Sequence, residues 1–340
     1  MLRITVELTN KCDLACKHCF SGRHGGHDEL PLEILEDVLE DARSLNFKHL
    51  SFTGGEPSLY SHLTYLLGRL SHYDYRFSFV TNGQTFEDFY PKLQPYLANL
   101  EHIIFSLDGA TARTHTALRG KGTFEKLISA MTLCKDNSVP FTHRVTLARH
   151  NVHQLKALCD LSLKSGSRGL RFAHLMPSPH TTVKGFDLTL EERKDVEQSI
   201  TKLSGEYQGR LAISLATGSC TTELVPCAPL HMQEVNIDVS GRLTKCKNLS
   251  SHGAGTGSAD VAGDLRYTSF KEAFLRLLLQ NSRFVRAKRA KFQKGEFTEG
   301  DKNPCWYCAN HFKKLGWLKH FEDASWHEYL WEEKPKQTSS

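Results

Sequence analysis

Residues 4–19 read ITVELTNKCDLACKHC, a strand-like segment followed by a cysteine-rich loop. The loop carries three cysteines at the spacing Cys-x-x-x-Cys-x-x-Cys: Cys12, Cys16 and Cys19. Thiolates at such short spacing are suitable ligands for an iron–sulfur cluster or for zinc. A structural zinc site needs a fourth ligand, and none is close in the sequence, although His18 or His24 could serve. Three cysteines on a cubane cluster instead leave one iron open for a small chelating ligand.

Beyond this loop, strand-like and helix-like segments alternate through the first two thirds of the chain. Strands are expected at residues 4–8, 48–52, 76–80, 102–107, 141–147 and 169–175. Helical spacing of apolar residues follows at residues 32–45, 63–70, 86–97, 124–135, 152–163 and 190–203. Because six such β–α units favour a parallel sheet with right-handed crossovers, we predict an α/β fold, a partial (β/α)6 TIM-like barrel.

Functional residues are expected where the strands end, because chemistry in such folds gathers at the C-terminal edge of the sheet. The cysteine loop follows the first strand, and Gly54-Gly55, Asn82-Gly83 and Asp108-Gly109 follow the next three. This shared placement predicts that four separate loops form one site.

About two thirds of the way along the chain the pattern changes, and a small C-terminal α+β domain is expected there. Residues 235–246 have the pattern of a hairpin that turns at Ser240-Gly241, and residues 269–279 have helical spacing. We therefore predict two domains, with residues 1–208 forming the barrel and residues 209–340 forming the second domain.

The composition is that of an ordinary globular protein of 340 residues, 39% of them hydrophobic, with a formal net charge of +5. This mild charge permits an acidic partner but does not require nucleic acid. No apolar run approaches the roughly 20 residues of a membrane span, and no export signal precedes the first strand, so we expect a cytoplasmic protein. In a reducing compartment, ten cysteines at short spacings indicate metal-binding or catalytic thiolates.

The cysteine spacing after a first strand resembles the signature of the radical S-adenosylmethionine (SAM) superfamily. Thr53-Gly54-Gly55-Glu56-Pro57 resembles the GGEP element of that family, and Ser106-Leu-Asp108-Gly109 resembles its fourth-strand element. The match runs over residues 4–180, with the motifs in the expected order. The resemblance implies SAM contacts from Gly54, Gly55 and Glu56 at the amino end, Ser106 and Asp108 at the ribose, Arg144 at the carboxylate, His18 near the adenine, and Phe20 as a further cofactor contact.

The resemblance also implies the cofactors and the reaction. The three loop cysteines would ligate a 4Fe-4S cluster, and SAM would chelate its open iron through the amino and carboxylate groups. One electron from the reduced cluster would split SAM into methionine and a 5′-deoxyadenosyl radical, which takes a hydrogen atom from an unactivated C–H bond of the substrate. Such an oxidoreductase requires a reductant such as flavodoxin or ferredoxin.

A second set of cysteines, together with Gly241 in the predicted hairpin, resembles the auxiliary-cluster domain of the SPASM/Twitch subfamilies. This set consists of Cys227, Cys246, Cys305 and Cys308. Four thiolates are enough to ligate a second 4Fe-4S cluster fully, and structural zinc is the alternative. Because no cysteine follows Cys308, the chain resembles the shorter Twitch form. Cys220 is left over as a substitute ligand, a catalytic thiol or a packed cysteine, and no other residue is singled out as catalytic.

SPASM/Twitch enzymes most often modify peptides, so the resemblance favours a maturase of a ribosomally made peptide. The alternatives are a small-molecule dehydrogenase that oxidises a sugar- or cyclitol-like alcohol, and a non-catalytic iron–sulfur or zinc module. Because the strand before the cysteine loop starts at the N-terminus, we expect no leader-recognition domain ahead of it. A peptide substrate would then need direct docking or a separate recognition protein.

Overall fold

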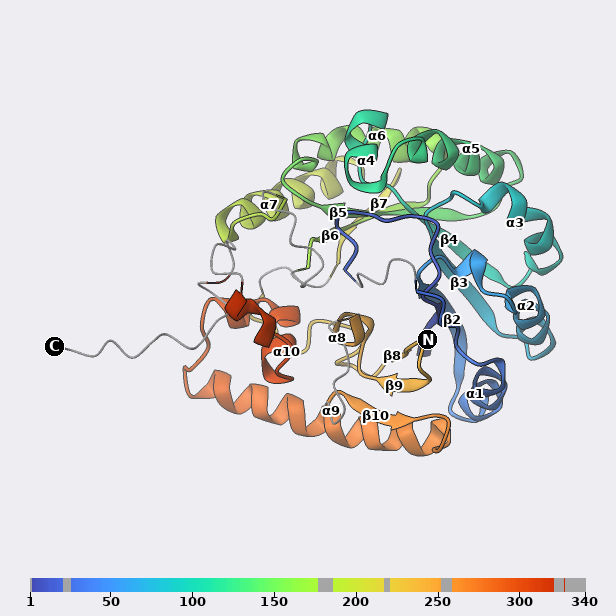
Figure 1. Cartoon of the computed structure of the whole chain (residues 1–340). Coiled ribbons are helices and arrows are strands. Elements are labelled where there is room, and N and C mark those ends of the chain that lie inside the picture. The colour runs from blue at the N-terminus through green and yellow to red at the C-terminus, as the bar shows by residue number, and fades with distance from the viewer. Residues whose placement is uncertain are drawn as a thin grey trace.

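The computed structural model describes residues 2–20, 26–176, 186–216, 221–251, 259–320 and 327. Its strands form one curved sheet in the order β10-β9-β8-β1-β2-β3-β4-β5-β6-β7 (Figure 1). The strands are β1 (Leu2–Thr9), β2 (Phe47–Gly54), β3 (Arg76–Thr81), β4 (Leu100–Ser106), β5 (Phe141–Leu147), β6 (Gly169–His174), β7 (Ala212–Leu215), β8 (Glu234–Ile237), β9 (Arg242–Thr244) and β10 (Val261–Asp264). Neighbours from β8 through β1 to β7 are parallel, and the β8–β9 and β9–β10 pairs are antiparallel.

Most of the helices lie along the outer side of this sheet, with α9 on the side of the molecule opposite α4 to α6 (Figure 1). The helices are α1 (Leu32–Ser44), α2 (Leu63–His72), α3 (Phe86–Leu93), α4 (Ala112–Arg119), α5 (Thr123–Asp136), α6 (Leu155–Ser165), α7 (Leu190–Glu206), α8 (Lys247–Ser251), α9 (Phe270–Gln293) and α10 (Pro304–His311). None of the helices among these described residues is long and apolar enough to cross a membrane.

Strand β5 shows how the two faces of the sheet differ. Its alternate residues Phe141, His143, Val145 and Leu147 are buried. His143 lies on the helix side, because its ring nitrogens contact Ser162 of α6 and Met131 of α5. Side chains alternate between faces along a strand, so Arg144 lies on the inner face, where it is exposed to solvent. The helix side thus forms the core, and the inner side carries polar groups.

The predicted α/β fold is confirmed, and β1 to β6 lie where the six parallel strands are expected. The predicted hairpin is present as β8 and β9, but β8 also pairs with β1 and extends the barrel sheet. This pairing satisfies hydrogen-bonding groups of β1 that an open edge would leave free. The division into two domains at residue 208 stays a prediction.

Helix α4 has no counterpart among the predicted helices, and helix α9 is longer than predicted. Helix α4 was not expected, because Leu118 is the only large apolar residue that it buries, and such a helix has little apolar periodicity. Helix α9 continues to Gln293, well beyond the predicted end at residue 279. Its buried face includes Lys288, a position that apolar periodicity alone does not predict.

Candidate active site

The three cysteines of the first motif lie in the loop that follows β1. Cys12, Cys16 and Cys19 are half-buried. The backbone amide of Cys19 donates to the Cys16 carbonyl at 3.1 Å, and that of Lys17 donates to the carbonyl of Leu118 at 2.9 Å. The second bond ties the loop to α4, so the helix that sequence periodicity missed helps to position the thiols.

The two glycines of the GGEP element contact the backbone at the start of the cysteine loop. The amide of Gly55 donates to the Thr9 carbonyl at 2.6 Å, and the amide of Glu56 donates to the Lys11 carbonyl at 2.8 Å. A Cβ atom on Gly55 would lie 2.0 Å from the Lys11 oxygen, and one on Gly54 would lie 2.4 Å from the Thr9 oxygen. Glycine is therefore required here for the two loops to pack together, whether or not it also allows SAM to approach.

We expect Gly55→Ala to displace the cysteine loop and to lower the iron and sulfide content of the reconstituted protein toward half of the wild-type value, because the second set of cysteines is not touched. The cause is a backbone clash that no side-chain rotation relieves. The matched control is Gly68→Ala inside α2, where the nearest atom to the new Cβ is a Tyr96 side-chain oxygen at 3.5 Å. That variant should keep its iron and gain up to about 1 kcal/mol of stability from helix propensity. Equal iron content in the two variants would contradict the prediction.

Glu56 connects the GGEP element to the loop after β3. The side chain is 1% exposed, and its carboxylate accepts hydrogen bonds from the Asn82 amide at 2.8 Å and the Ser58 hydroxyl at 3.0 Å. Burial raises the pKa of Glu56 to about 7. The Asn82 side chain in turn donates to Asp13 at 2.7 Å, directly beside Cys12. Glu56 therefore supports the cysteine loop indirectly, a role that the motif alone does not reveal.

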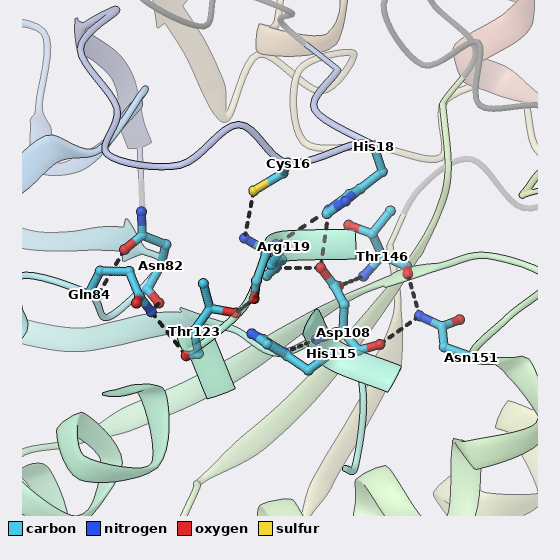
Figure 2. Close-up of polar contacts among 11 residues, drawn as sticks. Cys16, His18, Asn82, Gln84, Asp108, His115, Arg119, Thr123, Thr146 and Asn151 are labelled. Atoms are coloured by element: carbon cyan, nitrogen blue, oxygen red, sulfur yellow. Dashed lines mark hydrogen bonds and ion pairs between the residues drawn. The ribbon is translucent and has the colours of Figure 1, made fainter. Parts of the chain in front are cut away.

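Asp108 lies at the centre of a buried charge network (Figure 2). Its side chain is fully buried and accepts from Arg119 Nε at 2.5 Å, from the Thr146 amide at 2.7 Å, and lies 3.1 Å from His18 Nε2. Burial by itself raises the pKa of Asp108, but the charges of Arg119 and His18 outweigh it and lower the pKa well below its usual range. A second Arg119 nitrogen lies 3.9 Å from the Cys16 sulfur.

The network gives Asp108 contacts within the protein, and the ribose contact that the resemblance implies for it stays a prediction. Its carboxylate holds Arg119 against the cysteine loop, and Asn151 bonds the Asp108 carbonyl at 3.1 Å. Arg119 and Asn151 were missed at the sequence level, because neither belongs to a motif and the first lies on the unpredicted α4. Burial raises the pKa of Cys12 to about 12, so a bound metal would have to displace the proton of this thiol.

The other predicted SAM contacts lie on or near the same strand ends. Ser106, the buried last residue of β4, is the register partner of Arg144, which lies in the middle of β5. The protein around the inner face of the sheet removes part of the water from Arg144, although its side chain stays open to solvent, and this effect, followed by the charge of Arg171 on the neighbouring strand, lowers the pKa of Arg144. Phe20 is half-buried in the cysteine loop. Their roles toward SAM stay predictions.

The four cysteines of the second set line one cavity, although 81 positions separate the first from the last. They are Cys227, Cys246, Cys305 and Cys308. Gly241 turns the hairpin at a φ of +78°, and this turn brings β9, which leads to Cys246, back beside β8. Burial raises the pKa of Cys246 to about 12 and that of Cys305 to about 11. Cys220 lies outside the described residues.

The donor set of this cavity fits a fully ligated iron–sulfur cluster. Within the described part of the chain, no three His, Cys, Asp or Glu side chains are close enough to hold one metal ion directly. The four thiols instead line the walls of one cavity. Two buried lysines, Lys245 and Lys288, are close enough to the thiols to influence their ionisation.

Two contacts connect the cavity with the first set of cysteines. Lys247, directly after Cys246, donates a hydrogen bond to the side chain of Thr53, directly before Gly54. Arg144 lies near both Asp108 and Cys305. The charge of Asp108 raises the pKa of Arg144, and the charge of Arg144 lowers the pKa of Cys305. Both thiol sites therefore border the inner face of the sheet at the ends of its strands.

Comparison with known proteins identifies the family to which the first half of the chain is similar. Residues 6–162 match the model of the radical SAM superfamily. This part of the chain, which contains the first cysteine motif and the Asp108 network, is a radical SAM domain and belongs to that superfamily.

Among curated relatives, the mycofactocin maturase MftC of Mycolicibacterium smegmatis is 31% identical over 180 residues, which cover 52% of this chain and 45% of the relative. The PqqA peptide cyclase of Gluconobacter oxydans is 25% identical over 252 residues, which cover 72% of this chain and 70% of the relative. The chain thus spans about half the length of the maturase relatives it matches. These relatives support the resemblance to the SPASM/Twitch-type branch of the superfamily.

Two solved structures show the same fold. Streptococcus suis SuiB bound to S-adenosylmethionine matches with a TM-score of 0.64 and 15% identity, covering 81% of this chain and 67% of SuiB. The enzyme anSMEcpe with bound AdoMet and a peptide matches with a TM-score of 0.64 and 16% identity, covering 84% of this chain and 83% of that protein. At these identities the likeness concerns the fold.

Proposed function

We propose that this protein is a radical SAM enzyme of the SPASM/Twitch type that removes a hydrogen atom from a residue of a ribosomally made peptide. The observation that carries the proposal is the placement of two thiol sets along one inner sheet face, linked by the contact of Lys247 with Thr53. The set of three thiols would leave one iron of a 4Fe-4S cluster without a protein ligand, whereas the set of four would ligate every iron.

In this proposal Cys12, Cys16 and Cys19 hold a 4Fe-4S cluster with one iron free for SAM. When bound, cluster and SAM together supply the 5′-deoxyadenosyl radical by one-electron reductive cleavage. The protein positions these groups: Glu56 and Asn82 hold the loop around Cys12, and Arg119 places a positive charge next to Cys16. Arg144 offers an exposed guanidinium on the inner face for a carboxylate.

The four cavity cysteines would ligate the auxiliary 4Fe-4S cluster. A cluster with no free iron cannot bind substrate directly, so its role would be to accept an electron after hydrogen removal. The inner face between the two sites would then hold the substrate.

A peptide substrate is supported by the relatives, which are named a maturase and a peptide cyclase, and by the peptide bound to anSMEcpe. We propose flavodoxin or ferredoxin as the reductant, and a separate recognition protein or direct docking for the peptide. Seven ligating cysteines must stay reduced until the clusters assemble, which favours the cytoplasm.

The test is anaerobic reconstitution followed by metal analysis and reaction with SAM and dithionite. Wild-type protein should contain two cubanes, about eight iron and eight sulfide per chain, and should release 5′-deoxyadenosine and methionine. Zinc in place of iron, or intact SAM after many hours, would refute the proposal. Deoxyadenosine formed at a rate that rises with a sugar-like alcohol and not with any candidate peptide would favour the dehydrogenase alternative.

A further inference from the structure

Two lysines are buried beside the four thiols of the auxiliary site. Lys245 directly precedes Cys246 and lines the same cavity as the four cysteines. Lys288 comes from the inward face of α9, far along the chain. Each is only 2% exposed, whereas lysine is almost never fully buried without a charged partner. Negatively charged groups near the two lysines are therefore needed to stabilise their positive charges.

The direct contacts of both ammonium groups are neutral. Lys245 donates to the Asn281 side chain, and its nitrogen lies 4.8 Å from the centre of the Phe284 ring. Lys288 donates to the Leu224 carbonyl at 3.0 Å and lies 5.2 Å from the centre of the Tyr307 ring. These contacts fix the position of each nitrogen without cancelling its charge.

The acidic groups that face these lysines are chiefly the cysteines. Lys245 lines the cavity together with the four thiols. Lys288 lies over the ring of Tyr307, which directly precedes Cys308, and it bonds the carbonyl of Leu224, three residues before Cys227. The two carboxylates near these lysines already have lysine partners, because Asp260 pairs with Lys314 at 3.0 Å and Asp301 pairs with Lys291 at 2.8 Å. The negative charge left for Lys245 and Lys288 is that of the thiolate site.

We propose that Lys245 and Lys288 raise the reduction potential of the auxiliary cluster, which makes that cluster a better electron acceptor. The proposal rests on the proposed function, because it requires a cluster in the cavity. One-electron reduction adds a negative charge to a site already surrounded by four thiolates. A fixed cation nearby stabilises the reduced form more than the oxidised form, and the effect is large because the walls exclude water. Net charge around a cluster is one of the main determinants of its potential.

The test is a redox titration of the reconstituted two-cluster protein, followed by electron paramagnetic resonance. Lys245→Met and Lys288→Met should each change the ratio of oxidised to reduced auxiliary cluster at least tenfold at a fixed potential, a shift of about 59 mV to more negative values for a one-electron couple. The double variant should shift further. The potential of the SAM-binding cluster should stay within error of wild type in all of them.

Two matched variants separate a local charge effect from general ones. Arg289→Met removes one positive charge from the next residue of α9, on its exposed side, and should leave the auxiliary potential unchanged because solvent screens that charge. Lys288→Arg keeps the buried charge and should titrate close to wild type.

Three results would overturn the proposal. The first is an auxiliary potential that the neutral variants leave unchanged. The second is a shift of the same size in Arg289→Met. The third is loss of the auxiliary cluster from both neutral variants by iron and sulfide count, which would assign the lysines to folding of the cavity. A wild-type protein with only one cluster would instead refute the proposed function, so the two failures are distinguishable.

Discussion

Replacing Cys12, Cys16 and Cys19 together by alanine is expected to abolish SAM cleavage and to reduce the reconstituted protein from two cubanes to one. The expected loss of 5′-deoxyadenosine is complete, because the variant loop no longer carries a thiolate to hold the iron. The auxiliary site should keep its four iron, since its thiols come from a separate cavity. Iron and sulfide analysis with chromatographic quantification of deoxyadenosine measures both effects.

The control is Cys134→Ala, which removes a fully buried thiol of α5 that belongs to neither site. It should keep both clusters and normal SAM cleavage, at a cost of about 1 kcal/mol in stability for a small buried residue. The assignment of the cleavage site to this loop would be wrong if the triple variant produced more deoxyadenosine than a reaction mixture that contains no enzyme.

Arg119→Met is expected to lower the free energy of unfolding by about 3–5 kcal/mol, because it leaves the buried charge of Asp108 without its main partner. The folded state lowers the pKa of Asp108, so this stabilisation is present at neutral pH and is lost as the pH falls. SAM cleavage should fall as well, since Arg119 also contacts Cys16. Urea unfolding at matched cluster content, followed by circular dichroism, measures the stability change.

Two companion variants make this prediction specific. Adding Asp108→Asn to Arg119→Met removes the unpaired charge and should recover part of the lost stability. Arg149→Met breaks the exposed pair with Glu192, 2.7 Å apart, and should cost no more than about 1 kcal/mol. Equal costs for Arg119→Met and Arg149→Met would show that the Asp108 network does not stabilise the fold.

The order of strands and helices could be predicted from the sequence because each element is encoded by a local apolar pattern. The cysteine loop was found for the same reason, since its three thiols lie within eight residues. Glu56 was found through its motif, but its bonds to Asn82 and Ser58 depend on which strand ends are neighbours. Helix α4 escaped prediction because it buries few apolar side chains.

The sequence by itself determined the α/β class, the parallel order of the first six strands and the two sets of cysteines, all of which depend on spacing along the chain. Only the tertiary structure decided that Gly55 packs against Lys11, that Arg119 pairs with Asp108, and that Lys245 and Lys288 flank the auxiliary thiols. Some of these contacts join residues far apart in sequence and others join near neighbours, but the strength of all of them comes from burial. Burial is created when the sheet curves and its loops meet, so no local pattern encodes it.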